Sequence, residues 1–182
     1  MDCKEYYNIR NQIKNGDVIL YKGKNIISKL IRFFDKSYYD HCGIITTISG
    51  RFFTIDIINS SYHFVPLSRR MKQYEEFCIL RPVNKNDDEV SNAVNFIVDK
   101  FERDIKFDIL FFLKTLFFKR TGIDLFRVQI KNRIICSQLC QYFFSKLDIS
   151  SYKTCNLISP QDFIRLINDD EVDLLFDLSP KI

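Results

Sequence analysis

The sequence predicts an α+β fold, in which one antiparallel β-sheet in the middle of the chain packs against helices from both ends. Strand-like segments follow one another between residues 17 and 82, whereas helical periodicity appears once near the start and dominates from residue 87 onward. The chain has 182 residues, of which 46% are hydrophobic and 27% charged, and it contains no repeat or Gly/Ser-rich linker. We therefore expect residues 1–182 to form a single domain with one substantial core.

The first elements follow a turn signal at Asn15-Gly16. The segment "DVILYK" (17–22) is predicted to be a strand and "NIISKLIRFFD" (25–35) a helix, and residues 1–14 are expected to be an N-terminal extension. The helix is predicted from the spacing of its apolar residues, which are Ile27, Leu30, Ile31 and Phe34.

A β-hairpin is predicted next. The segments "HCGIITTI" (41–48) and "RFFTIDII" (51–58) flank Ser49-Gly50, which is typical of a two-residue turn, so Ile48 should pair with Arg51. The sheet is expected to continue through "YHFVPL" and "FCILRP", which end near Pro66 and Pro82 because proline cannot donate to a strand ladder.

The second half of the chain is predicted to be mainly helical. The segment "DDEVSNAVNFIVDKFERD" (87–104) has acidic residues in its first turn and apolar residues on one face. The segment "FDILFFLKTLFF" (107–118) is predicted to be a buried core helix, because Lys114 interrupts it and a bilayer span needs roughly 20 residues. Residues 107–132 are expected to form an insertion that shapes or covers a pocket, and a short last helix is predicted after Ser159-Pro160.

Charge and cysteine content argue against several classes of protein. The net charge of +4 is too small and too evenly spread to indicate nucleic-acid binding. The six cysteines have neither disulfide-framework nor zinc-site spacing, so we expect no metal and no organic cofactor. The chain starts with a polar segment that lacks the apolar stretch of a secretory signal, so we expect a cytoplasmic protein with reduced thiols.

Cys136 is the candidate nucleophile, in the stretch "RIICSQLCQYFF". It is predicted to lie in the first turn of a helix, where free N–H groups and the positive end of the helix dipole stabilise a thiolate and can hold an oxyanion. Cys140, one turn further on, is expected to be inert packing. The alternative for Cys136 is that it is also a small buried hydrophobic residue.

His41 is the candidate base, because a thiolate nucleophile requires a histidine partner. Counting across the predicted hairpin places Gly43 opposite Asp56, so Asp56 should lie diagonal to His41 on the same face and orient the imidazole. An acid among Phe and Ile is also costly to bury unless it is paired. The alternatives are that His41 is a structural residue, that Asp56 faces solvent, or that His63 is the base.

Taken in order, these motifs resemble the circularly permuted branch of the NlpC/P60 (papain-like) superfamily, and within it the YiiX/YebB-like cysteine hydrolases with poxvirus relatives. The resemblance extends over most of the chain, from about residue 15 to residue 167. The chain departs from the family in having Asp56 and Gln138 where the family usually has Glu. The matching residues are Gly16-Asp17, Ser37, His41-x-Gly43-Ile44, Asp56, Cys136-Ser137-Gln138-Leu139 and Pro160-x-Asp162.

The resemblance implies a permuted papain-like fold, with a central antiparallel sheet or barrel against helices, and a thiolate–imidazolium pair formed by Cys136 and His41 with Asp56 as the third member. The expected activity is cleavage of a peptide, cell-wall-type or isopeptide amide through a thioester acyl-enzyme. The expected oxyanion donors are the N–H of Cys136 and the side chain of Tyr21. Ser137 and Gly43 are also expected to line the oxyanion or substrate site.

Two alternatives remain at this point. The thioester could carry a lipid acyl group, as in an acyltransferase or phospholipase, with the aromatic segment 107–118 contacting lipid. The fold could also serve as a binding module without catalysis. The basic stretch "SRRMK" (68–72) is expected to be a solvated loop.

Overall fold

A six-stranded antiparallel sheet forms the centre of the computed structural model, which describes residues 3–58, 61–74, 76–101, 106–107, 117, 121–122, 133–149 and 159–178. The strand order is β4-β3-β2-β1-β5-β8. The sheet is open, because β4 and β8 lie at its two edges. The strands are β1 (Val18–Lys22), β2 (His41–Ile48), β3 (Arg51–Ile58), β4 (Ser61–Pro66), β5 (Glu76–Pro82) and β8 (Val172–Asp177).

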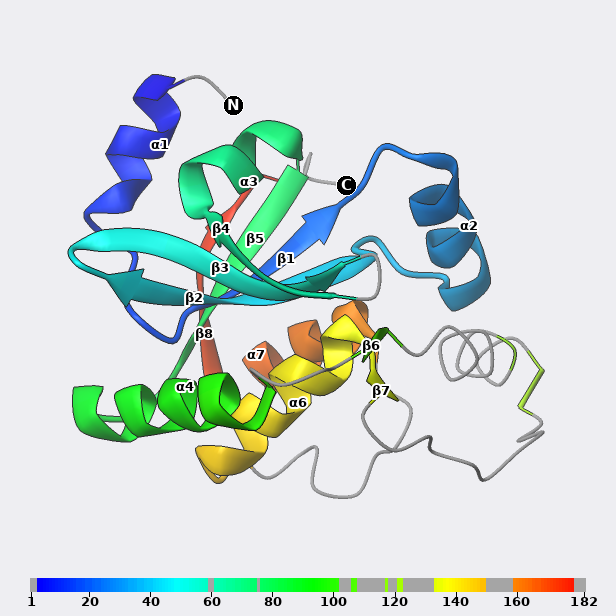
Figure 1. Cartoon of the computed structure of the whole chain (residues 1–182). Helices are drawn as coiled ribbons and strands as arrows, with labels where there is room; N and C mark the ends of the chain where they lie inside the picture. The colour runs from blue at the N-terminus through cyan, green and yellow to red at the C-terminus, as the bar shows by residue number, and fades with distance from the viewer. Residues whose placement is uncertain are drawn as a thin grey trace.

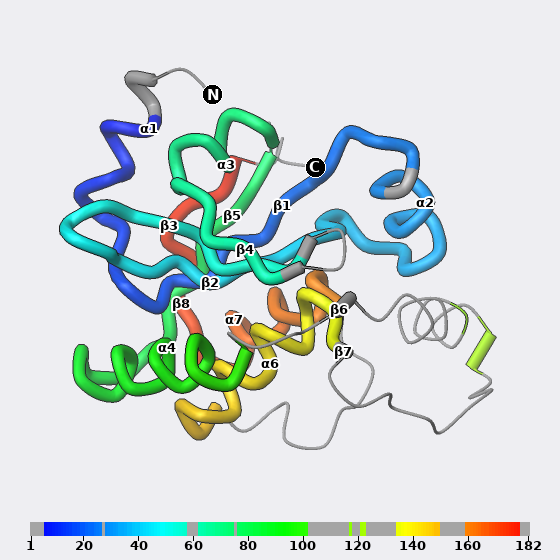
Figure 2. The backbone as a smooth tube through the Cα atoms, in the orientation of Figure 1, coloured from blue at the N-terminus to red at the C-terminus, as the bar shows by residue number. Residues whose placement is uncertain are grey.

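Helices cover both faces of this sheet (Figure 1). The helices α4, α6 and α7 lie below the sheet in that view, and α1 and α3 lie above it. The backbone trace in Figure 2 shows the same division, with α2 set at the end of the sheet where β2 begins. The helices are α1 (Cys3–Arg10), α2 (Ile26–Asp35), α3 (Leu67–Gln73), α4 (Asp87–Phe101), α6 (Cys136–Lys146) and α7 (Arg165–Asn168), with a 3-10 turn at Pro160–Ile164.

Strand alternation gives the sheet two buried faces. Leu20, Ile44 and Ile55 belong to a core cluster with residues of α4 and α6, whereas Ile19 and Ile45 pack with residues of α1 and α3. Because both faces are covered, the central strands are nearly continuous apolar runs, and polar residues buried in them require partners.

The β2–β3 hairpin is confirmed in its predicted register. Ile48 pairs with Arg51. Ser49 and Gly50 have φ angles of 49° and 73°, the positive values that a two-residue hairpin turn with matching twist requires. The register continues toward the start of β2, where Gly43 lies against Asp56.

Several elements differ from the sequence-based expectation. The sequence suggests a central meander, but β1 lies between β2 and β5, so the order of strands in the sheet is not their order in the chain. Residues 67–73 form helix α3, and the "SRRMK" stretch is therefore not a solvated loop, because Arg70 and Met71 are buried on its inner side. The edge strand β8 was not predicted, since the apolar residues of "VDLLFD" do not alternate and Leu174 is 44% exposed.

The predicted core helix 107–118 lies mostly outside the described residues. Phe107 itself belongs to β6 (Lys106–Phe107), which pairs in parallel with β7 (Arg133–Ile134). This two-residue pairing brings together the two ends of the proposed insertion 107–132. Among the helices that the structure describes, none combines the length and apolar character needed to cross a bilayer.

Candidate active site

Cys136 is the first residue of α6, as predicted. Ile135 precedes the helix in an extended conformation with φ −107° and ψ 165°. Its carbonyl oxygen accepts hydrogen bonds from the N–H groups of Gln138 and Leu139, at 3.1 and 3.2 Å. The N–H of Cys136 lies two positions before that of Gln138, where a helix offers no internal acceptor. The positive end of the helix dipole therefore lies at this thiol.

Gln138 stabilises the same helix start. Its Oε1 accepts a hydrogen bond from the N–H of Ile135 at 3.0 Å. This bond is one half of a capping box, which glutamine can form as well as glutamate. Because Ile135 has no side-chain acceptor, the reciprocal half is absent. Gln138, at the position where the YiiX/YebB-like hydrolases usually have Glu, therefore keeps the capping contact and places no negative charge beside Cys136.

His41 is the first residue of β2 and lies where the sheet meets the start of α6 (Figure 1). Its ring stacks on Tyr21, its direct partner in β1, with centroids 5.8 Å apart and planes inclined by 20°. Its side chain is 13% exposed. The Nε2 atom points toward Asp56, which leaves Nδ1 as the ring nitrogen available to Cys136.

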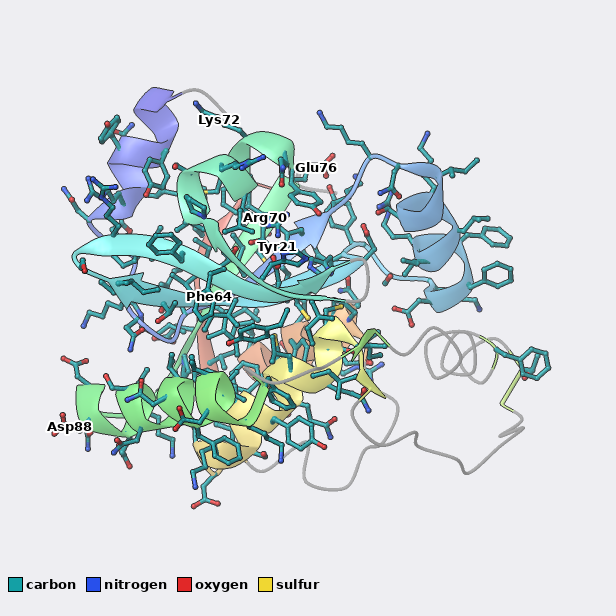
Figure 3. All side chains as sticks on the ribbon, in the orientation of Figure 1. Tyr21, Phe64, Arg70, Lys72, Glu76 and Asp88 are labelled. Carbon is teal, nitrogen blue, oxygen red and sulfur yellow. The ribbon has the colours of Figure 1, made fainter. Side chains whose placement is uncertain are left out.

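Asp56 is fully buried and lies between two cations. Its Oδ2 is 3.8 Å from Nε2 of His41, a distance for an ion pair and longer than a hydrogen bond. Its Oδ1 accepts a hydrogen bond from Nη2 of Arg70 at 2.8 Å. The separation of 3.8 Å between Asp56 and His41 is typical of catalytic hydrogen bonds in the absence of substrate, which are often long. Figure 3 shows Arg70 and Tyr21 on the same side of the sheet.

The electrostatics of the pair favour charge separation. The pKa of Cys136 is held well below its ordinary value of 9.0 by a hydrogen bond from Cys42 and, against the effect of burial, by the charge of His41. Burial alone would lower the pKa of His41, but the Cys136 thiolate and Asp56 outweigh it and raise that pKa well above 6.5. A thiol with a lowered pKa beside an imidazole with a raised one favours the thiolate–imidazolium form of the pair.

Cys42 is a contact that the sequence did not indicate. It follows His41 in β2 but points to the opposite face, toward α6, where it packs in the same core cluster as Cys136. Burial and the neighbouring Cys136 raise the pKa of Cys42 well above 9.0. Cys42 is therefore a neutral thiol that donates to the sulfur of Cys136.

The residues expected to bind an oxyanion or substrate are buried. Tyr21 is fully buried, and among the residues that the structure describes its hydroxyl group has Thr54 as its polar neighbour. Burial, together with the charge of Asp56, raises the pKa of Tyr21. Its ring packs against the rings of His41 and Tyr74.

Gly43 and Ser137 are also buried. A Cβ on Gly43 would lie 3.0 Å from the carbonyl oxygen of Ile55 and 3.1 Å from Cβ of Asp56. The space beside Gly43 is thus filled by Asp56 and its strand, and we correct the expectation that it admits substrate. Ser137 is fully buried in the first turn of α6.

His63, the alternative base, also lies beside Asp56. It is the direct β4 partner of Asp56 in β3, so the two side chains share a face of the sheet. The Asp56 oxygens, however, face Arg70 and His41. The contacts around Cys136 therefore favour His41 as its partner.

Arg70 is the functional candidate that the sequence analysis missed. Its side chain is 7% exposed and donates to both Asp56 and Gln73. The signal was present in the spacing of Leu67, Arg70 and Met71, which places all three on one face of a helix that follows Pro66. Because the "SRRMK" stretch was interpreted as a uniform run of charge, the buried face of this helix was not recognised.

Comparison with known proteins supports the fold class. No family model matches the chain, and no curated protein matches it in sequence. The structure is similar to the crystal structure of the metalloprotein YiiX from Escherichia coli O157:H7, with a TM-score of 0.58 and 15% identity, over 93% of this chain and 99% of that chain. The protein therefore has a YiiX-like α+β fold, and at this identity the likeness concerns the fold alone. Within the described part of the chain, no three His, Cys, Asp or Glu side chains form a group that could hold a metal ion.

Proposed function

We propose that the protein is a cysteine hydrolase that cleaves an amide or ester bond through a thioester intermediate on Cys136. The observation that carries this proposal is the pairing of a buried thiol of lowered pKa, at a helix start, with an imidazole of raised pKa that is backed by a buried carboxylate. A cysteine away from this site behaves in the opposite way, because burial raises the pKa of Cys78 to about 12.

The first chemical step follows from these positions. The Cys136 thiolate attacks the substrate carbonyl carbon, and the carbonyl π-electrons move to oxygen. The N–H of Cys136 at the start of α6 is placed to stabilise this oxyanion. When the tetrahedral intermediate collapses, His41 gives its proton to the leaving amine or alcohol, and the acyl group remains on sulfur as a thioester.

The second step regenerates the enzyme. His41, now neutral, accepts a proton from a water molecule while the oxygen of that water attacks the thioester. The carboxylic acid is then released, and the Cys136 thiolate forms again. Asp56 stabilises the imidazolium present before and after the reaction, and Arg70 and Tyr21 hold Asp56 and the imidazole ring in place. The proposed catalytic residues are Cys136, His41 and Asp56.

Acyl transfer from p-nitrophenyl acetate tests this proposal. Attack by the thiolate should release p-nitrophenolate and leave an acetyl group on Cys136, which intact mass and peptide mapping would detect and which hydroxylamine would remove as expected for a thioester. Cys136→Ala should abolish both the burst of p-nitrophenolate and the adduct.

Cys140→Ala is the matched control, because it removes a thiol of the same helix one turn deeper. It should retain the burst. An acetyl adduct spread over several cysteines, or a burst that survives in Cys136→Ala, would contradict the proposal.

A further inference from the structure

Helix α2 presents its apolar side to solvent, the reverse of an ordinary surface helix. Ile26 is 74% exposed, Phe33 65% and Leu30 51%. These positions recur at spacings of four and three and so lie on one side of the helix, with Phe34, 39% exposed, beside them. Figure 3 shows aromatic side chains of α2 projecting away from the body of the protein.

Polar side chains hold the opposite side of α2 against the protein. Arg32 donates to the carbonyl oxygen of Gly23 at 2.8 Å and forms an ion pair with the buried Asp40 at 2.5 Å. Ser28 is buried against Gly23, where an added Cβ would lie 2.1 Å from its hydroxyl. The outward direction of the apolar side is therefore fixed by buried polar contacts and is part of the fold.

The exposed apolar side is bordered by positive charge. Among the described side chains between residues 24 and 36, the exposed ones are four apolar side chains, Asn25 and three lysines. The acid in this stretch, Asp35, is half-buried on the inner side. The three lysines are Lys24, Lys29 and Lys36.

We propose that α2 docks the protein on the surface of an anionic lipid bilayer. The exposed side of α2, defined as Ile26, Leu30, Phe33 and Phe34, would enter the boundary between headgroups and acyl chains, and the lysines would contact anionic headgroups. Leucine and phenylalanine with flanking lysine are the composition of interfacial helices. This inference concerns localisation of the chain and holds whether or not Cys136 is catalytic.

The lysines make a second copy of the chain a poorer occupant of this surface. A two-fold dimer through α2 would place the same patch on both sides of the interface and bring the same three lysines together. Like charges brought together across a two-fold interface repel, whereas anionic headgroups attract them.

Co-sedimentation with vesicles of phosphatidylcholine containing phosphatidylserine tests the proposal on the full chain. The wild-type protein should pellet with these vesicles, should pellet less at high salt, and should stay largely in the supernatant with pure phosphatidylcholine. Leu30→Gln combined with Phe33→Gln should lower the apparent affinity at least about tenfold, because two apolar side chains no longer enter the bilayer.

The matched control is Leu174→Gln combined with Phe64→Gln, which removes the same two residue types from exposed sites elsewhere, 44% and 40% exposed. This control should bind as the wild type does. Circular dichroism should show both double variants folded, and both should keep the iodoacetamide reactivity of Cys136, so that loss of membrane binding is separated from loss of the active site.

Three results would overturn the proposal. The wild-type protein could fail to pellet with anionic vesicles, or the α2 variant could bind as tightly as the control. Sedimentation velocity could also show a wild-type dimer that the α2 variant converts to monomer, which would identify a second copy as the occupant of this surface.

Discussion

A single carboxylate links the two buried cations of the site. Asp56 has no exposed surface, and its two oxygens face Arg70 and His41. A buried charge is tolerated only when it is paired, and loss of one partner leaves the other uncompensated. The Asp56–Arg70 pair should therefore stabilise the fold as well as hold the carboxylate that faces the imidazole.

Arg70→Ala should lower the free energy of unfolding by about 3 kcal/mol, because it leaves Asp56 buried without its hydrogen-bonded partner. Urea denaturation measures this change. Arg69→Ala is the matched control, since Arg69 is the exposed neighbour on the same helix, and it should change stability by less than about 0.5 kcal/mol. Equal losses in the two variants would show that the buried pair does not stabilise the fold.

Much of the site could be anticipated from single residues. The cysteine at a helix start, the histidine at a strand start and the isolated acid were each visible in the sequence, and Asp56 shares the His41 face because the hairpin turn has two residues. Arg70, Cys42 and Tyr21 could not be placed in the same way. Their contacts depend on how α3 and α6 pack on the sheet, which local spacing does not specify.

At the scale of elements, helix α6 brings the candidate nucleophile to the sheet. Its first turn is stabilised by the bond between Gln138 and the N–H of Ile135, and Cys140, Phe143 and Phe144 bury its inner side. The helix start therefore depends on one side-chain acceptor, and the position of the Cys136 thiol depends on the helix start.

Gln138→Ala should destabilise the protein by about 1 kcal/mol, the usual cost of a lost helix-capping contact. Thermal unfolding followed by circular dichroism measures the effect. Gln138→Glu keeps the acceptor and should retain most of the stability, but its negative charge should raise the pKa of Cys136. If Gln138→Ala unfolds at the wild-type temperature, the capping bond does not support the start of α6.

Elements were predicted where a periodic pattern and a turn signal coincide. The β2–β3 hairpin satisfies this condition, and helices α4 and α6 were predicted from their apolar spacing. Strand β8 lacks the alternation of a half-buried strand, and α3 follows directly on β4 with Pro66 between them. Helix α2 was identified from its apolar spacing, but spacing alone does not say whether an apolar side faces the core or the solvent.

At the scale of the whole molecule, the C-terminal strand is joined to the segment that leads to His41. β8 pairs with β5 at the sheet edge, and the hydroxyl of buried Tyr39 donates to Oδ1 of Asp177 at 3.0 Å. Two segments 138 residues apart in the sequence thus meet two residues before the candidate base. The periodicity of a sequence predicts local elements and does not predict contacts between residues so far apart in the chain.

Tyr39→Phe should lower the free energy of unfolding by about 1 kcal/mol, because it removes this hydrogen bond while keeping the ring. Tyr7→Phe removes a hydroxyl from a side chain that is 63% exposed and should leave stability unchanged. Equilibrium urea unfolding of the two variants compares them directly. A Tyr39→Phe variant as stable as Tyr7→Phe would mean that this contact does not hold β8 in place.

The thiolate–imidazolium pair predicts a particular pH dependence of alkylation. A lowered pKa keeps Cys136 ionised as pH falls through neutrality, and the raised pKa of His41 keeps the stabilising cation present as pH rises. Reactivity of Cys136 should therefore be high and nearly constant around neutral pH. An ordinary thiol, with a pKa of about 8.5, loses reactivity about tenfold for each pH unit below that value.

The most direct measurement is the pH dependence of Cys136 alkylation by iodoacetamide in the wild type and in His41→Ala, with peptide mapping to separate the six cysteines. The account predicts that Cys136 reacts fastest in the wild type, with an apparent pKa well below about 8.5, and that His41→Ala moves this pKa upward. If Cys136 instead reacts as slowly as the buried Cys140 in both proteins, with no dependence on His41, the pair does not exist and the proposed hydrolase is wrong.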